Sequence, residues 1–360
     1  MVAYIRKETV ERKRWLDAVA FNGGVALCQM LPGATAMQVA AYVGLRVRGV
    51  WGAAASYIGF GLPAFLLMIL LAALYTSMHA LPIVTAAFTG LQALIVAIIA
   101  NAAFSFGKAT LHHWKQYAIA GVAAILFGLN ANPLLVIGLA AVAGWLLIQP
   151  MPLPASPTSA ARASSSTTKP LLVILTATAL GLVGLYLVQL RLFTLTTLLM
   201  RIDLTAFGGG FASVPLMFHE IVDVRQWLDG PTFMNGIVLG QVTPGPIVIT
   251  ATFLGYLLYG WPGGILATFG IFFPSFVVVV ATAPYVDRLR TSVVFNKIIV
   301  GVLCSFVGLL VTVTLRFAGN VHWNLSLALL AGAGLTALLL KVDLLWVVAA
   351  GLVASVLLVH

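Results

Sequence analysis

Charged residues are scarce in this 360-residue chain. Only 8% of the residues are Asp, Glu, Lys or Arg, and nine are acidic, whereas 61% are hydrophobic. Soluble domains carry about 25% charged residues, so this composition excludes an ordinary soluble protein. Together with a mean hydropathy of +1.08, it indicates a multi-pass protein embedded in the lipid bilayer.

Cysteines and catalytic signatures are also scarce. Cys28 and Cys304 both lie inside apolar segments, so we interpret them as packing residues rather than as a disulfide or a metal site. The membrane segments contain no HExxH, no paired catalytic aspartates and no Ser/His constellation, and the chain has no Walker A sequence. We therefore expect no enzyme, no ATP-driven pump, no metal and no cofactor.

Basic residues outnumber acidic ones, which gives a formal net charge of +10. They are spread through short loops, which fits the positive-inside rule of membrane proteins better than a nucleic-acid surface. No nucleic-acid partner is expected. His112 and His113, beside Lys108 and Lys115, are typical of a solvated loop.

Apolar stretches long enough to cross a bilayer, about 20 residues each, predict an all-α fold. A segment rich in Pro, Ser, Thr and Ala at 150–170 predicts a flexible linker between a first unit at 1–149 and a second unit at 190–360. The stretches are 49–75, 82–105, 116–130, 132–149, 171–189 (a connecting helix), 192–214, 262–283, 294–316, 323–340 and 342–359, with 18–45 and 233–257 each interrupted by Pro-Gly.

The two units are copies of one another. Residues 8–34 align with residues 220–246 at an offset of 212, with 11 of 27 positions identical, Trp15 with Trp227 among them. After a one-residue shift the match continues at an offset of 211. The paired residues there are Gly44, Gly49, Gly52, Gly59 and Pro63 with Gly255, Gly260, Gly263, Gly270 and Pro274. We interpret Gly44, Gly49, Gly52, Gly255, Gly260 and Gly263 as packing and turn residues.

One motif occurs only once. The stretch 192–214 leads into FGGGFASVP, Phe207 to Pro215, and the corresponding glycines of the first unit would lie before Met1. We expect either a shortened member of its kind or a true start upstream of Met1.

The motifs follow a fixed order: FGG, a charged stretch ending in WLD, QxxPG, spaced glycines and a membrane proline. In this order the chain resembles the long, two-domain form of the CHR family of chromate transporters. It departs from that pattern by lacking the first FGG and by reading Pro32-Gly33-Ala34 where the second unit reads Pro244-Gly245-Pro246. The resemblance implies chromate export across a bacterial-type cytoplasmic membrane, driven by the membrane potential or the proton gradient, and chromate resistance.

Each Pro-Gly pair predicts a broken helix, because proline removes a backbone donor. A helix that restarts there presents free N–H groups and the positive end of its dipole, which suits a tetrahedral oxyanion. A plain kink is the alternative. The candidate translocation residues are Gln29, Pro32, Gly33 and Thr35 in the first unit and Gln241, Thr243, Pro244, Gly245 and Pro246 in the second. Gly208, Gly209 and Gly210 are further candidates, with close helix packing as an equal alternative.

Ionisable residues within membrane segments are functional candidates. Arg201 and Asp203 are two residues apart, so they lie on different helix faces and are not expected to pair. Arg201 is a candidate for attracting the anion. Asp203 is a candidate for carrying a coupling proton or for neutralising an arginine of another helix, and an interfacial position is the alternative for both. Arg14, Glu220 and Arg225 are candidate path charges before the broken helices.

Topology and substrate leave alternatives open. If the QxxPG segments cross the membrane, the connecting helix inverts the second repeat; if they are re-entrant, the repeats are parallel. We favour inversion, because it builds an alternating-access site from two equivalent halves. The functions considered are chromate export, transport of a related oxyanion such as sulfate, and an intramembrane enzyme or assembly factor. The oligomeric state stays open.

Overall fold

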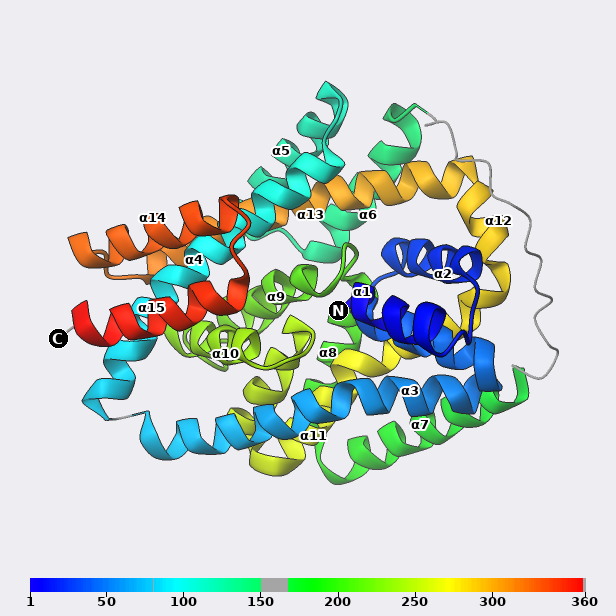
Figure 1. Ribbon diagram of the computed structural model, residues 1–360, viewed down its shortest axis with the longest axis horizontal. Coiled ribbons are helices and arrows are strands. Elements are labelled where there is room, and N and C mark those ends of the chain that lie inside the picture. Colours follow the sequence, from blue (N-terminus) through cyan, green and yellow to red (C-terminus); the bar gives the residue numbers. More distant parts are fainter. Residues whose placement is uncertain (80, 150–167, 359–360) are drawn as a thin grey trace.

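The computed structural model of the protein describes residues 1–79, 81–149 and 168–358 (Figure 1), and all regular structure in these ranges is helical, which confirms the all-α class. Most of the predicted linker, residues 150–167, lies outside the described residues. Among the described helices, five are long and apolar enough to cross a membrane: Thr35–Met78, Pro82–Thr110, Thr168–Val188, Ile247–Tyr285 and Val293–Asn320.

The two halves contain corresponding elements in the same order. The first half has α1 (Val2–Arg6), the π-helix η1 (Lys7–Arg12), α2 (Ala18–Met30), α3 (Thr35–Met78), α4 (Pro82–Thr110), α5 (Trp114–Gly128) and α6 (Pro133–Leu147). The second has α9 (Gly210–Phe218), η2 (His219–Val224), α10 (Gly230–Val242), η3 (Ile247–Ile249) with α11 (Thr250–Thr282), α13 (Val293–Asn320), α14 (Leu325–Leu339) and α15 (Leu344–Leu358). Short elements η4 (Ala283–Tyr285) and α12 (Val286–Thr291) precede α13.

Two helices have no counterpart in the described part of the first half. These are α7 (Thr168–Val188) and α8 (Leu190–Thr205). The prediction of one helix over 192–214 is wrong, because the chain leaves the helical conformation at Ala206 and restarts at Gly210. The connecting helix also begins earlier than the predicted 171, since Pro170 is compatible with the first turn of a helix.

The duplication extends to single residues. Asp17 caps α2 by accepting a hydrogen bond from the Ala20 N–H at 2.7 Å, and Asp229 caps α10 through the Thr232 N–H at 2.6 Å. Such caps satisfy an N–H group that a helix start otherwise leaves free. The sequence WLD therefore marks the same local structure in both halves.

The long helices α3 and α11 are each folded back on themselves. In α3 the Ser56 hydroxyl donates to the Ala40 carbonyl at 2.8 Å, although these residues would lie about 24 Å apart in a straight helix. The reversals occur at Gly49, with φ +64°, and at Gly260, with φ +62°. Beside the first reversal, Gly44 lies against Gly52 so closely that neither has space for a Cβ atom. The interpretation of these glycines as turn and packing residues is confirmed.

The chain also reverses at each Pro-Gly break. Gly24 of α2 packs against the ring of Tyr42, and Gly236 of α10 packs against Phe253. If the helix continued in the same direction past Pro-Gly, Gly24 and Tyr42 would lie about 27 Å apart. The expected single crossing of each QxxPG segment is therefore wrong. We call α2 with residues 35–47 the first hairpin and α10 with residues 247–258 the second hairpin; their tips are residues 31–34 and 243–246.

The two halves are interlocked. Helices α5 and α6 of the first half pack on α13, while α14 and α15 of the second half pack on α4. The contacts are equivalent: Gly144 of α6 touches Gly301 of α13, and Ser355 of α15 touches Gly90 of α4. Each half thus completes its packing only with helices of the other.

Corresponding helices run in opposite directions. In Figure 1 the second leg of α3 ends at the left, where α4 begins, whereas the second leg of α11 ends at the right, near α12 and the start of α13. This is the arrangement expected of inverted repeats. It occurs together with reversed Pro-Gly segments, a combination that neither topology expected from the sequence contained.

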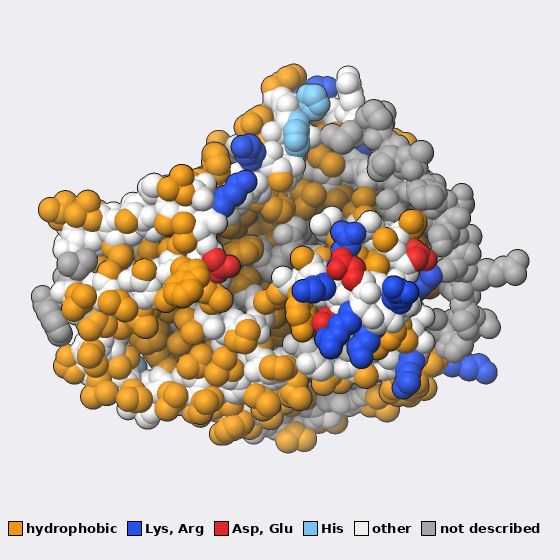
Figure 2. Space-filling view, viewed as in Figure 1, with side chains coloured by type: hydrophobic (Ala, Val, Ile, Leu, Met, Phe, Trp, Pro, Cys, Tyr) orange, Lys and Arg blue, Asp and Glu red, His pale blue; other side chains and the backbone are white. Residues whose placement is uncertain are grey.

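Charged side chains gather on one part of the surface. Figure 2 shows Lys and Arg concentrated where Figure 1 places α1, and hydrophobic side chains along the left and lower edges of the molecule. Exposed basic residues there include Arg6, Lys7, Arg12, Lys13 and Arg14. An apolar periphery with a local charged patch fits a protein that contacts lipid along its edges. His112 and His113 are exposed, as expected of a solvated loop.

Candidate functional site

The tip of each hairpin rests on the opposite half. Gly33 donates its N–H to the Ala206 carbonyl at 2.8 Å, and a Cβ atom at Gly33 would overlap the Ser275 hydroxyl. At the second tip, a Cβ atom on Gly245 would lie 2.6 Å from that of Ala64. Ala64 and Ser275 follow Pro63 and Pro274, which correspond in the repeat. The two tips therefore occupy equivalent seats.

Three helix N-termini converge beside these tips. Helix α3 begins at Thr35, α9 at Gly210, and the η3–α11 run at Ile247. A Cβ atom on Gly209 would lie 3.4 Å from the Thr35 Oγ1, and one on Gly210 would lie 3.3 Å from the Ile247 Cγ2 and 4.0 Å from the Val248 N. Each N-terminus has N–H groups without intrahelical partners and the positive end of a dipole. The arrangement can hold an anion by backbone donors alone.

The FGG segment is shaped by its glycines. Gly208 and Gly209 both have φ +89°, a conformation that residues with a side chain rarely adopt. A Cβ atom on Gly208 would also clash with the Phe106 ring. Close packing and turn formation thus both apply at this segment. It allows α9 to begin facing the start of α3.

A cavity of about 390 Å³ adjoins the FGG segment. Its lining includes Gly208 and Phe211 from the start of α9 and Asn101 and Ser105 from α4, together with apolar residues of α13, α14 and α15. Helices of both halves therefore line a space that reaches the N-terminus of α9.

Several buried polar atoms near the hairpins have no hydrogen-bond partner in the described chain. They include the Gln241 Nε2 on α10, the Gln38 Oε1 on α3 and the Ser213 Oγ on α9. The Gln38 Nε2 donates to the Pro32 carbonyl at 2.5 Å and so fixes the first tip. Unpaired buried polar groups are costly and commonly mark sites that bind something.

Asp203 is fully buried at the first tip. Its carboxylate accepts hydrogen bonds from the Ser275 N–H, at 2.7 Å, and from the Ser275 hydroxyl, at 2.6 and 2.8 Å to its two oxygens. It forms no ion pair among the described residues, so the alternative that it neutralises an arginine of another helix is wrong. The expectation that Arg201 and Asp203 do not pair is confirmed.

The sequence profile described as "Chromate transporter" matches residues 1–145 and 193–356, which include both hairpins and most of α8. The chain belongs to the chromate transporter family. This confirms the resemblance drawn from the motif order, and it makes the protein a membrane transporter rather than an enzyme.

Curated relatives of this chromate transporter family member span most of its length. The "Uncharacterized transporter MJ0718" of Methanocaldococcus jannaschii is 40% identical over 98% of this chain and 88% of its own. The "Chromate transport protein" of Pseudomonas aeruginosa is 30% identical over 87% of this chain and 75% of its own. The "Chromate transport protein" of Cupriavidus metallidurans is 28% identical over 92% of this chain and 80% of its own. No solved structure matches the chain.

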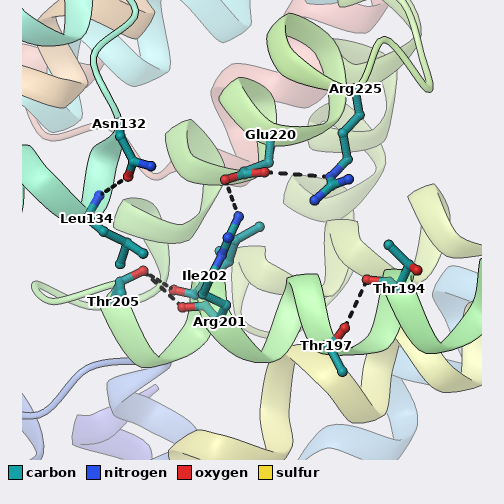
Figure 3. Close-up of polar contacts among 9 residues, drawn as sticks. All are labelled: Asn132, Leu134, Thr194, Thr197, Arg201, Ile202, Thr205, Glu220 and Arg225. Carbon is teal, nitrogen blue, oxygen red and sulfur yellow. Dashed lines mark hydrogen bonds and ion pairs between the residues drawn. The ribbon is translucent and has the colours of Figure 1, made fainter. Parts of the chain in front are cut away.

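Two carboxylates of η2, Glu220 and Asp223, form ion pairs in this family member. Figure 3 shows Glu220 between Arg201 of α8 and Arg225, with which its Oε2 pairs at 3.6 Å. The neighbouring Asp223 pairs with Arg316 of α13. These pairs tie α8 and α13 to the π-helix that leads into the second hairpin. Arg14, by contrast, is exposed, with φ +51°.

The predicted candidates separate into two groups. Thr35, Gly209, Gly210 and Pro246, which caps η3, meet at the convergent N-termini. The second group differs in exposure or in hydrogen bonding. Gln29 and Pro244 have exposed side chains, and the Thr243 hydroxyl donates to the Gly240 carbonyl at 2.9 Å. Their roles stay predictions.

Three residues near the tips were missed from sequence: Ser213, Gln38 and Ser275. Only Ser275 carried a signal, since it directly follows a membrane proline, where a helix leaves polar groups free.

Proposed function

We propose that this protein exports chromate across the cytoplasmic membrane, driven by the membrane potential or the proton gradient, and so gives chromate resistance. The observation that carries the proposal is the convergence of the N-termini of α3, α9 and η3–α11 in a member of the chromate transporter family. Relatives named as chromate transport proteins support the substrate.

The chemistry of the anion fits this arrangement. Chromate is a small tetrahedral oxyanion, usually a dianion near neutral pH, and leaving water requires several donors to surround its oxygens. Backbone N–H groups from three directions supply such donors. Backbone N–H groups and helix dipoles carry only partial charges, so the attraction stays weak enough for release. A transporter needs that balance more than it needs tight binding.

The seats of the two hairpin tips suggest how access alternates. Each tip rests on the opposite half, at Ser275 or at Ala64. In transporters with inverted repeats, one repeat rocks against the other around a fixed site. Unseating one tip while the other stays seated would open the site to one side of the membrane at a time.

Sulfate is the second candidate substrate. It has the same shape and charge as chromate, and backbone N–H groups contact only the outer oxygens. The site as built has little means to reject it, so we expect sulfate to compete with chromate.

The test is uptake of labelled chromate into everted membrane vesicles, with and without a pH gradient and with sulfate as competitor. Changing both Pro244 and Gly245 to Leu should abolish uptake, because it removes the break that exposes the η3–α11 N-terminus. The matched control is Gly121→Leu on α5, where a Cβ atom meets no other atom within 4 Å. No chromate uptake by the wild type, or normal uptake by the double variant, would contradict the proposal.

A further inference from the structure

We propose that Asp203 is the proton-binding residue of this transporter: its carboxylate takes up a proton when the oxyanion binds at the convergent N-termini and releases it when the oxyanion leaves. The inference rests on the proposed function and selects between its two driving forces: a proton that leaves together with the anion lets the membrane potential, and not the proton gradient, drive export. It assigns the proton to one side chain.

Asp203 is isolated from compensating charge. Its side chain has no exposed surface, and the groups that face it are the Ser275 side chain and N–H of α11, the Tyr57 phenol of α3 and Gly33 of the first tip. Arg201, on the same helix, is directed to Glu220 instead. In the described part of the chain no lysine or arginine pairs with Asp203. An ionised carboxylate without a cation is costly to bury, so neutralisation by a proton is favoured whenever another anion approaches.

The groups around Asp203 can form hydrogen bonds with either protonation state of its carboxyl group. When the carboxylate is ionised, the Ser275 N–H and hydroxyl both donate to it. When one oxygen carries a proton, that O–H can donate to the Ser275 Oγ, at 2.6 or 2.8 Å. The Ser275 hydroxyl can then turn to the Tyr57 oxygen, whose own hydrogen goes to the Phe272 carbonyl at 2.7 Å. A proton can therefore come and go without rearranging the backbone.

The first tip places this carboxylate next to the anion site. A Cβ atom on Gly33 would lie 2.9 Å from the Asp203 Oδ1. Two residues later, Thr35 begins the helix whose N-terminus faces Gly209 and Gly210. An oxyanion held there and an ionised Asp203 would be two negative charges in one poorly solvated region, where like charges disfavour each other's ionised form. Binding of the anion therefore raises the proton occupancy of Asp203.

The charge balance follows directly. One proton from the aqueous phase joins the Asp203 carboxylate as one chromate dianion binds, and both leave on the other side. With Asp203 protonated, the loaded site carries one negative charge fewer than it would with chromate bound beside an ionised Asp203. Each cycle moves one net negative charge outward, so an interior-negative membrane potential drives export, and an acidic exterior opposes it.

A purely structural role is the competing explanation. Pro274 lacks an N–H, and Asp203 accepts a hydrogen bond from the N–H of the next residue, Ser275, within α11. An asparagine can accept the same hydrogen bonds through its carbonyl oxygen, but its amide does not bind a proton near neutral pH. Asp203→Asn therefore separates the two roles.

The first experiment measures the proton uptake of the purified full-length protein on chromate binding, by calorimetry in two buffers of different ionisation enthalpy. At mildly alkaline pH, where free chromate is the dianion, the wild type should take up close to one proton and D203N close to none. Asp343→Asn, which keeps the exposed cap of α15, should behave as the wild type. Equal uptake by the wild type and D203N, or no uptake by the wild type, would overturn the inference.

The second experiment uses proteoliposomes. Exchange of labelled for unlabelled chromate at equal concentrations needs the site but no driving force, and D203N should retain it with a flatter pH profile. With one linked proton, wild-type affinity should fall by up to about tenfold per pH unit above the titration of Asp203, beyond the change seen for D203N. An unchanged profile in D203N overturns the inference while leaving chromate export standing. A wild type that exchanges no chromate refutes the proposed function itself.

Two further variants keep the test decisive. Ser275→Ala gives the first seat the residue found at the second seat, Ala64, and should keep the proton uptake on chromate binding. If Ser275→Ala abolished this proton uptake while D203N retained it, the structural role would be favoured. Should D203N fail to fold, Asp203→Glu retains a titratable carboxyl, and its pH profile should be displaced from that of the wild type. A profile that coincides with the wild type would overturn the inference.

Discussion

The two hairpin tips share one geometry but differ in chemistry. Gly33 of the first tip lies against Ser275 and the Asp203 carboxylate, whereas Gly245 of the second tip lies against the methyl group of Ala64. The first tip needs Gly33 at φ +103°, while Gly245 has no positive φ. Duplication thus supplied two equivalent seats, and Ser275 of α11 together with Asp203 of α8 makes one of them polar. Neither half therefore holds a complete site, since each tip is completed by residues of the other.

The largest expected effect comes from a methyl group at each tip glycine. Gly33→Ala should abolish chromate exchange in proteoliposomes, because it forces a left-handed conformation, at roughly 1–2 kcal/mol, and also overlaps Ser275. Gly245→Ala should reduce exchange less, since only the contact with Ala64 is crowded. The second defect should be rescued by Ala64→Gly, and the first should not be rescued by Ser275→Gly. Equal rescue at both tips would contradict the asymmetry.

A second contrast concerns the glutamines that precede the tips. Gln241→Ala should lower chromate transport at least about tenfold if the unpaired Nε2 serves the translocated anion, by analogy with the loss of a group that binds a charged partner. Gln29 is exposed, so Gln29→Ala should stay close to the wild type. Both are measured as initial rates of exchange, with the amount of folded protein checked by gel filtration. A larger loss with the Gln29 variant would reverse the order.

A third contrast concerns the corresponding residues Glu8 and Glu220. Glu220 joins two arginines at a side-chain exposure of 14%, while Glu8 pairs with the mostly exposed Arg12 within one helical turn. Glu220→Gln should destabilise by about 1–2 kcal/mol, as for partly buried charge pairs. Glu8→Gln should cost about 0.3 kcal/mol, typical of exposed pairs four residues apart. Thermal unfolding in detergent checks both, and similar shifts would show that burial does not separate them.

The smallest contrast concerns the matched caps. Asp17→Ala and Asp229→Ala each remove one capping hydrogen bond and should each destabilise by about 1 kcal/mol. Because the local geometry is duplicated, the losses of stability in the two variants should differ by no more than a few tenths of a kcal/mol. Comparing unfolding temperatures of the two variants in the same detergent measures it. A clearly unequal pair would indicate that one hairpin depends on its start far more than the other.

Sequence reasoning recovered what repetition and local chemistry encode. The offset of 212 located both Pro-Gly breaks, and the spacing of Arg201 and Asp203 separated their partners. It did not recover the direction of the chain after each break, because Pro-Gly is compatible with a kink, a crossing or a reversal. Only long-range packing, such as Gly24 on Tyr42, decides among them.

The candidate site was recovered in part for the same reason. Thr35 was singled out by its position beside a Pro-Gly break and Gly210 as part of the FGG segment, and both are local information. The approach of Gly33 to Ser275 joins residues from opposite halves, and no local pattern encodes it. The break at Ala206 was missed because the surrounding residues are apolar enough to continue a helix.

The interlocking of the halves sets an order of events during synthesis. Helices α5 and α6 are made early, yet the surface of α13 on which they pack is translated only after α6, the linker, α7 and the second hairpin. At typical translation rates of 5–20 residues per second, the delay is roughly 10–30 s. During that interval the first half waits in the membrane with unmatched small-residue faces, such as the one at Gly144, covered only by lipid. A nascent chain of this kind depends on its own second half as its assembly partner.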